Sequence, residues 1–121
     1  ENALEVGRVP RILHPGLPSH PQHNLAMSQM EAAGPIFAFE VEDRKQAHAL
    51  LDGLGLIDIS NNIGDSRSLM THPASTTHYG VSPEARAEMG VTEGLLRLNV
   101  GLEDPRDLID DLDQALRGVG L

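Results

Sequence analysis

Near its C-terminus the chain places a two-faced strand directly before a capped amphipathic helix, and this pair most constrains the fold. Residues 94–101, GLLRLNVG, alternate between two sets of side chains: Leu96, Leu98 and Val100, and Leu95, Arg97 and Asn99. Such alternation predicts a strand with two distinct faces. The next segment begins with Asp104 as a cap and Pro105 in the first turn. Its helical spacing points these residues to the core: Leu108, Ile109, Leu112, Ala115 and Leu116.

Earlier segments repeat this alternation of strands and helices. Further strands are predicted at residues 8–13 (RVPRIL), 36–41 (IFAFEV) and 56–60 (LIDIS). A helix is predicted from Pro21 to Gly34, with an apolar stripe of Leu25, Ala26, Met30 and Ala33. Another begins after the cap Asp43, ends at Gly53 and carries a stripe of Ala47, Leu50, Leu51 and Leu54. A short helix runs from Ser82-Pro83 to Gly90, and residues 61–81 show no periodicity and read as a long loop.

This order of elements predicts an α+β fold. We expect a two-layer sandwich of about four mostly antiparallel strands, with helices on one face, because each element has one apolar side to bury. The helix after Asp104 also carries Asp107, Asp110, Asp111 and Asp113, which we expect to be mostly solvated. A chain of 121 residues suits one domain with a core of its own.

Charge and aromatic content argue against nucleic acid as a partner. The net charge is -9, with 9 basic residues against 18 acidic ones, so no basic stripe is available to follow a phosphate backbone. Phe37, Phe39 and Tyr79 are the aromatic residues, too few for a base-stacking platform. We expect the acidic excess to serve solubility.

Cysteine is absent, which excludes disulfides, thiol nucleophiles and Cys-ligated zinc. The absence is compatible with a reducing compartment, and we expect a cytoplasmic protein. No apolar run approaches the roughly 20 residues that cross a bilayer, so no membrane association is expected. The sequence opens at Glu1 without an initiator Met, and we expect it to be a piece of a longer polypeptide.

The stretch SLMTHPASTTH, residues 68–78, concentrates hydroxyl and imidazole groups. Ser68 or Ser75 with His72 or His78 would supply a Ser–His pair, but the G-x-S-x-G nucleophile motif is missing. Ser and Thr at such positions more commonly form hydrogen bonds within turns. The histidine pairs His20/His23 and His72/His78 are candidate metal ligands, yet they lack a motif such as H-E-x-x-H. We expect structural roles and no metal.

Two basic residues need separate interpretation. Arg97 lies on the strand face opposite Leu96 and Leu98. Its guanidinium either reaches solvent or borders a cleft, where it would grip a carboxylate through two parallel hydrogen bonds. The pattern leaves both possibilities open. Lys45, the single lysine, falls in the first turn of a helix beside acidic residues, where nothing would desolvate it as a Schiff-base lysine requires.

Two blocks of sequence resemble a known enzyme family. SRSLMTHPASTTH, followed 19 residues after His78 by Arg97 in LLRLNVGLEDPRDLIDDLDQAL, resembles the C-terminal part of the Cys/Met-metabolism family of pyridoxal-phosphate enzymes. PGLPSHPQHNLAMSQM and ISNNIGDSRSL resemble its O-succinylhomoserine sulfhydrylase branch in particular. The resemblance covers essentially the whole chain.

The resemblance implies a domain organisation. Family members are fold-type-I enzymes with a large domain, which carries the cofactor lysine, and a smaller C-terminal α+β domain. Residues 1–6 would be the end of a linking helix and residues 7–121 the smaller domain. Relatives carry a longer connector at this point, so we expect residues to be absent between Val6 and Gly7. The implied partner is the large domain of the same enzyme, within a homotetramer.

The resemblance also implies site residues. Arg97 would bind the α-carboxylate of an amino-acid substrate, and Asn62 would supply a second carboxylate contact through its amide. No catalytic or cofactor-binding residue would lie in this chain, which alone would be inactive.

The implied activity of the parent enzyme is a pyridoxal-phosphate-dependent γ-replacement that converts O-succinylhomoserine and sulfide to homocysteine in methionine biosynthesis. The alternatives are O-acetylhomoserine sulfhydrylase and cystathionine γ-synthase or γ-lyase. A hypothesis of a different class is a non-catalytic module that binds small ligands or partners.

Overall fold

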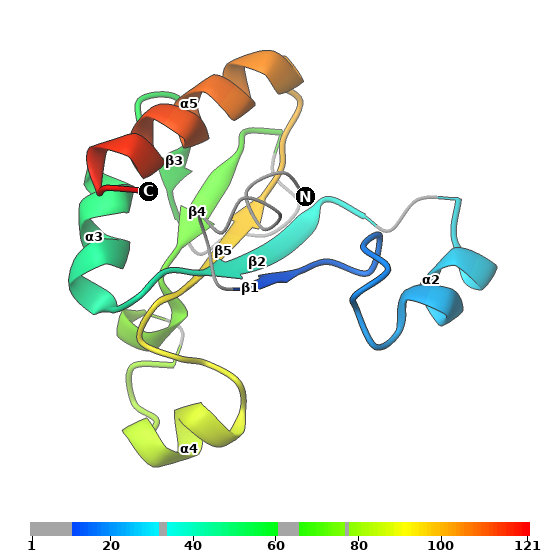
Figure 1. The fold of residues 1–121 in the computed structure, drawn as a ribbon, viewed down its shortest axis with the longest axis horizontal. Helices are drawn as coiled ribbons and strands as arrows, with labels where there is room; N and C mark the ends of the chain where they lie inside the picture. The colour runs from blue at the N-terminus through cyan, green and yellow to red at the C-terminus, as the bar shows by residue number, and fades with distance from the viewer. Residues whose placement is uncertain (1–10, 32–33, 61–65, 77) are drawn as a thin grey trace.

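The computed structural model describes residues 11–31, 34–60, 66–76 and 78–121. In these ranges five strands form one mixed sheet in the order β1-β2-β5-β4-β3 (Figure 1). The strands are β1 (Arg11–Leu13), β2 (Ile36–Glu40), β3 (Asp58–Ile59), β4 (Leu69–Thr71) and β5 (Leu95–Asn99). The helices are α2 (His23–Gln29), α3 (Arg44–Asp52), α4 (Pro83–Glu88) and α5 (Pro105–Gly118), with a 3-10 turn η1 (Pro73–Ser75).

Strand β5 is central, and it is antiparallel to both β2 and β4. Its alternation is confirmed: Leu96 pairs with Phe39 and Leu98 with Phe37 on one face, where α3 and α5 pack over the sheet (Figure 1). The aliphatic core lies between these two layers. The predicted α+β architecture is therefore confirmed, with mostly antiparallel pairing; β3 alone pairs in parallel, with β4.

Side-chain caps begin three of the helices where the sequence predicts them. Asp43 accepts a hydrogen bond from the Gln46 amide at 2.8 Å, and Asp104 accepts one from the Arg106 amide at 2.8 Å. The Ser82 hydroxyl accepts from the amide of Ala85 at 3.2 Å. Each cap satisfies a backbone donor that the first turn of a helix leaves without a partner.

Strand β4 lies within residues 61–81, which the sequence predicts as a loop, so that part of the prediction is wrong. Leu69, Met70 and Thr71 are all buried. A strand covered on both faces shows no polar–apolar alternation, and three residues are too few for any period. From Ser68 to the end of η1 the segment is instead held in place by the pairing of β4 in the sheet.

Asp111 corrects a second expectation, because it is 7% exposed and not solvated. Its carboxylate accepts hydrogen bonds from the backbone amides of Gly55, Leu56 and Ile57 at 2.7–2.8 Å. Burial is the largest influence on its pKa and opposes ionisation, but these three bonds and one from Gln114 together lower the pKa. Asp111 thereby fastens α5 to the segment that leads into β3.

Two apolar predictions also fail. Ile109 in α5, which we expect to face the core, is 63% exposed, and Leu25 in the predicted apolar stripe of α2 is 52% exposed. Helix α2 projects beyond the edge of the sheet (Figure 1), so among its residues only Ala26 is buried. Ile109 therefore lies on the solvent-exposed side of α5. The linking helix at 1–6, the proposed gap at Val6 and Gly7, and Asn62 lie outside the described residues.

Two glycines allow β5 to sit between its neighbours. A Cβ on Gly94 would overlap the carbonyl of Val41, and one on Gly101 would lie 2.5 Å from the carbonyl oxygen of Ser66. Both obstacles are backbone atoms, which cannot swing aside as a flexible side chain does. The central strand is therefore fixed at both ends by close backbone approach.

Replacing Gly94 by alanine should destabilise the chain by at least about 3 kcal/mol, because backbone must move to admit the methyl group. Urea unfolding followed by circular dichroism measures this. Gly118→Ala is the matched control, since a Cβ there meets nothing within 4 Å. It should leave stability unchanged or raise it by up to about 1 kcal/mol. Equal losses in both variants would contradict the packing argument.

Asp111→Asn should lower the free energy of unfolding by about 2–4 kcal/mol at pH 7, because an amide offers one oxygen where two accept now. The lowered pKa makes this stabilisation full above the ordinary carboxyl range, and it is lost as pH falls through the folded-state pKa. The neighbouring exposed Asp110→Asn serves as control and should stay within about 0.5 kcal/mol of the parent. Similar values for both would show that the amide contacts contribute nothing.

Candidate functional site

Arg97 occupies the middle of the central strand, on the face opposite α3 and α5. The register sets it between Ala38 of β2 and Thr71 of β4. Its side chain is partly buried. A small apolar cluster, made of Ala74, Val91, Leu95 and Ala38, covers the part of this face nearest the start of β5. Arg97 therefore follows directly after the covered part of this face along β5.

The turn that follows β4 is built from side-chain hydrogen bonds. Thr71 is 1% exposed, and its hydroxyl lies 3.0 Å from that of Thr76. The Thr76 hydroxyl also donates to the carbonyl oxygen of His72 at 2.8 Å. These contacts fold η1 back on the end of β4, on the strand next to Arg97.

His72 fixes this turn against the segment that leads into β5. Its Nε2 contacts the carbonyl oxygen of Glu93, which can only accept, so Nε2 carries the proton. Nδ1 therefore accepts from the Ser75 hydroxyl at 2.7 Å. Burial lowers the pKa of His72, and the nearby charges of His48 and Arg44 act in the same direction. The ring is accordingly neutral at pH 7 and stacks edge-on with His48 at 4.9 Å between centroids.

The structure thus brings together one of the predicted Ser–His combinations, Ser75 with His72. The backbone carbonyl that orients His72 carries no charge to stabilise an imidazolium, unlike the carboxylate of a catalytic triad. Ser68 bonds elsewhere: its hydroxyl donates to Glu103 at 2.9 Å and accepts from the Gly101 amide at 2.8 Å. In this geometry the hydroxyl and imidazole groups hold backbone segments in place.

A buried arginine that the sequence does not reveal supports the adjoining loop. Arg86 in α4 donates to the carbonyl oxygens of Val81 at 2.9 Å and His78 at 3.3 Å. It also pairs with Glu93 at 3.2 Å, and Arg44 pairs with the other oxygen of that carboxylate at 2.6 Å. The hydrogen bond from Arg44, with the charges of both arginines, lowers the pKa of Glu93. No spacing or motif in the sequence marks Arg86.

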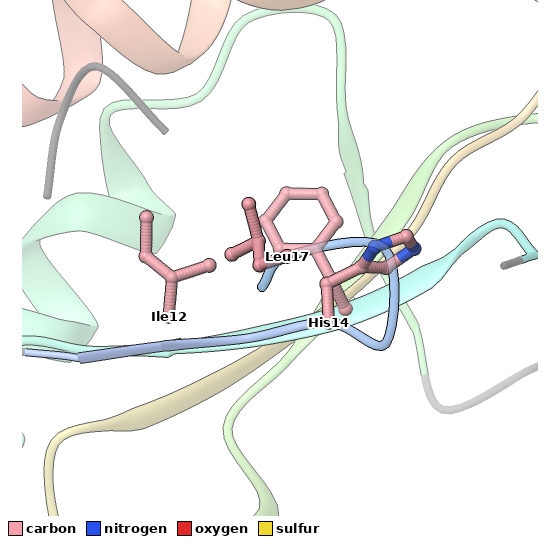
Figure 2. A pocket seen from close by; sticks show the side chains of 4 residues that line it. Ile12, His14 and Leu17 are labelled. Atoms are coloured by element: carbon pink, nitrogen blue, oxygen red, sulfur yellow. The ribbon is translucent and has the colours of Figure 1, made fainter. Parts of the chain in front are cut away.

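The N-terminal histidines also bond to backbone. An open hollow near β1 is lined by Ile12, His14, Leu17 and Phe37 (Figure 2). Among these four described residues the ionisable side chain is His14, which accepts from the Gly16 amide and donates to the carbonyl of Gly34, both at 3.0 Å. This hollow is therefore a mainly apolar surface whose imidazole is already engaged.

The metal candidates His20 and His23 both bond to backbone of the same turn region. The Nδ1 of His20 accepts from the amide of Gln22, and the Nδ1 of His23 donates to the carbonyl of Pro15. Within the described ranges, no group of three or more His, Asp or Glu side chains is arranged to hold a metal ion. Lys45 is exposed in the first turn of α3. None of the described helices combines the length and apolar character needed to span a membrane.

Comparison with known proteins gives concordant results. Residues 4–117 match the model of the family described as Cys/Met metabolism PLP-dependent enzyme. The chain is 50% identical over 110 residues to O-succinylhomoserine sulfhydrylase of Mycobacterium tuberculosis (strain ATCC 25618 / H37Rv), covering 87% of this chain and 27% of that protein. It is 42% identical over 111 residues to cystathionine gamma-lyase of Mus musculus, covering 91% and 28%.

A solved structure gives the same match in three dimensions. Cystathionine gamma synthase from Xanthomonas oryzae pv. oryzae, in complex with aminoacrylate and cysteine, superposes with a TM-score of 0.87 at 39% identity. The alignment covers 93% of this chain and 29% of that one. The chain thus spans less than a third of the length of these relatives.

Stability should fall as pH decreases from 7 to 5, because the unfolded chain takes up a proton at His72 more readily than the folded one. The contribution of this histidine is at most about 1.4 kcal/mol per pH unit. Urea titrations at pH 5, 6, 7 and 8 measure it. His72→Gln should be less stable at pH 8 and show a shallower slope, and an identical slope would contradict the assignment. Three carboxyl groups with lowered pKa values also make stability depend on pH, but in a separate range, below about pH 4.5. They belong to Glu93, Glu103 and Asp111.

Proposed function

The chain belongs to the Cys/Met-metabolism family of pyridoxal-phosphate-dependent enzymes, and we propose that it is the C-terminal substrate-binding domain of such an enzyme. In this proposal residues 7–121 form the domain and residues 1–6 end a linking helix. The share of the relatives that the chain matches, 27–29%, supports a domain of a longer polypeptide. Its partner is the large cofactor-binding domain.

The position of Arg97, partly buried in the middle of the central strand, is the observation that carries the proposal. A guanidinium presents parallel N–H donors that match the two oxygens of a carboxylate. Strand β5 is hydrogen-bonded on both sides, so the side chain starts from a rigid base. Partial burial reduces competition from water and strengthens the ion pair. We assign Arg97 to the α-carboxylate of an amino-acid substrate and Asn62 to a second contact with the same group.

The chain's own contribution is to bind and orient. Pyridoxal phosphate, when bound, supplies the electron sink that makes chemistry at the γ-carbon of an amino acid accessible. Lys45, the only lysine, lies exposed on α3 and does not fit covalent attachment of the cofactor, which needs a desolvated amine. We therefore place the attachment site in the large domain. Holding the carboxylate fixes which bonds of the substrate reach the reacting centre.

For the parent enzyme we propose the conversion of O-succinylhomoserine and sulfide to homocysteine and succinate, in methionine biosynthesis. The support is the 50% identity to a relative named for that activity, against 45% to an L-methionine gamma-lyase and 42% to a cystathionine gamma-lyase. Cystathionine γ-synthase activity is the second candidate, since a synthase from Escherichia coli (strain K12) is 39% identical. A cytoplasmic homotetramer is the assembly we propose.

The full-length, cofactor-loaded enzyme tests the role of Arg97. Arg97→Ala should raise KM for O-succinylhomoserine and lower kcat/KM by about 100-fold to 1,000-fold, because charge-assisted hydrogen bonds to the carboxylate disappear. Homocysteine formation is the readout. Arg106→Ala is the control, since Arg106 is exposed and pairs with Asp104 at the start of α5. It should remain within twofold of the parent, and an unchanged kcat/KM in Arg97→Ala would remove that residue from the site.

Competition between sulfur donors separates the proposed activities. With O-succinylhomoserine held constant, the sulfhydrylase assignment predicts a larger kcat/KM for sulfide than for cysteine, and a synthase predicts the reverse.

Calorimetry of the 121-residue chain with amino acids addresses the non-catalytic alternative. Micromolar binding would favour a ligand-sensing module, whereas half of an enzyme site should bind weakly or not at all.

A further inference from the structure

Residues 12–30 form the longest stretch of the sequence without Asp, Glu, Lys or Arg. The 9 basic and 18 acidic residues of the chain all lie outside this uncharged segment. The next longest such stretch, residues 68–83, contains β4, and every residue from Ser68 to Ala74 is buried. In the uncharged segment, by contrast, Ala26 alone is buried. A stretch that has no charge and that the domain does not bury is typical of a surface covered by a partner.

The uncharged segment exposes large apolar side chains. Leu25 and Met27 in α2 are 52% and 40% exposed, and Met30, directly after the helix, is 46% exposed. Ile12 and Leu17, at the other end of the segment, line the apolar hollow beside β1 (Figure 2). Enrichment in methionine together with depletion of charge distinguishes the centre of a protein interface from the remaining surface.

Helix α2 gains little stability from this domain. It has seven residues and no side-chain cap, and Ala26 is its one buried residue. Isolated helices shorter than about 12 residues are marginal in water, so a covering surface is needed to stabilise this one. The segment is nevertheless held in shape, because the rings of His14 and His23 bond to its backbone and to Gly34 at 2.7–3.0 Å. A preformed apolar surface loses less conformational entropy when a partner covers it.

Two partners are candidates for this surface, a second copy of the chain and the large domain of the parent enzyme. The net charge of -9 makes two copies repel each other at pH 7. The chain spans 27–29% of the length of its relatives, so in the proposed organisation most of the parent polypeptide lies outside this domain. A large domain that precedes β1 is joined to this edge of the sheet, next to the hollow, and the covalent link gives it a high effective concentration there.

We propose that the uncharged segment is the surface on which this domain docks against the large domain of the same polypeptide. The inference rests on the proposed function and names where its two domains meet. Docking covers Leu25, Met27 and Met30 and stabilises α2.

Hydrogen exchange of the unsubstituted proteins tests the docking. Exchange of the amides of residues 23–30 is measured by mass spectrometry in the 121-residue chain and in the full-length, cofactor-loaded enzyme. It should be at least about 10-fold slower in the enzyme, because full burial of one leucine side chain stabilises the closed helix by about that factor. Equal rates in the two proteins would overturn the proposal. Exchange in the 121-residue chain that slows to the rate of the enzyme as concentration rises would also overturn it, because the partner would then be a second copy.

Leu25→Asp and Ile109→Asp form a matched pair, since both replace an aliphatic side chain that is more than half exposed on a helix. In the 121-residue chain each should change the exchange of residues 23–30 by less than about twofold. In the full-length enzyme Leu25→Asp should speed this exchange about 10-fold or more, because a charge is placed in an apolar interface, and Ile109→Asp should stay within about twofold. Equal effects of the two variants in the enzyme would contradict the docking. Should Leu25→Asp fail to fold, Leu25→Ala gives the same comparison with an expected effect of about threefold.

A photo-crosslinker identifies the covering surface. With p-benzoyl-phenylalanine in place of Leu25 in the full-length enzyme, irradiation should yield crosslinks to peptides of the large domain, at the mass of one polypeptide on a denaturing gel. A product at twice that mass would overturn the assignment to the same polypeptide. The proposed function is decided separately, by the kcat/KM of Arg97→Ala. Equal exchange rates together with a strong effect of Arg97→Ala would remove the docking surface and leave the proposed function in place.

Discussion

The alternation of side chains along β5 is the constraint on which the remaining structure depends. Leu96 and Leu98 are buried against α3 and α5, which forces Arg97 onto the opposite face. A slip of one residue in the register would turn the guanidinium into an aliphatic core, where an unpaired charge is very unfavourable. The core and the candidate site are therefore specified by the same five residues.

Carboxylates that accept hydrogen bonds from backbone amides hold the loops between the strands and helices in place. Asp111 holds the segment before β3, and Glu103 holds the start of β4 through the amide and hydroxyl of Ser68. The hydrogen bond from the Ser68 amide is also the largest influence on the pKa of Glu103, which it lowers. In a chain with few aromatic side chains to fill space, these anchors fix loops that a larger core would otherwise fix by packing.

The sequence predicts those parts of the fold in which a local pattern and the tertiary environment agree. Strands β2 and β5 alternate clearly, and Asp43, Ser82 and Asp104 mark helix starts, so these elements are found where expected. Strand β4 escapes prediction because both of its faces are buried. The role of Asp111 is not predicted from the sequence, because the amides that donate hydrogen bonds to this carboxylate lie more than 50 residues away in the chain. The spacing of charges along a helix carries no information about such distant donors.

The candidate site, too, is predicted by the sequence only in part. Periodicity gives the face on which Arg97 lies but leaves open what that face borders, and the family resemblance supplies the expectation of a carboxylate. The buried contacts of His72 and Arg86 arise from segments that meet only in the folded sheet. Asn62 lies outside the described residues, so its assignment rests on the resemblance alone.

The contrast between α2 and β5 sets a gradient of local stability. Among the residues of α2 only Ala26 is buried, and the segment projects from the sheet (Figure 1), whereas β5 is paired on both sides. Amide protons of such a short projecting helix exchange with solvent through local opening, while those of a doubly paired strand exchange only when the whole domain unfolds. Helix α2 can therefore open locally or rearrange against another surface, and the strand that carries Arg97 stays undisturbed.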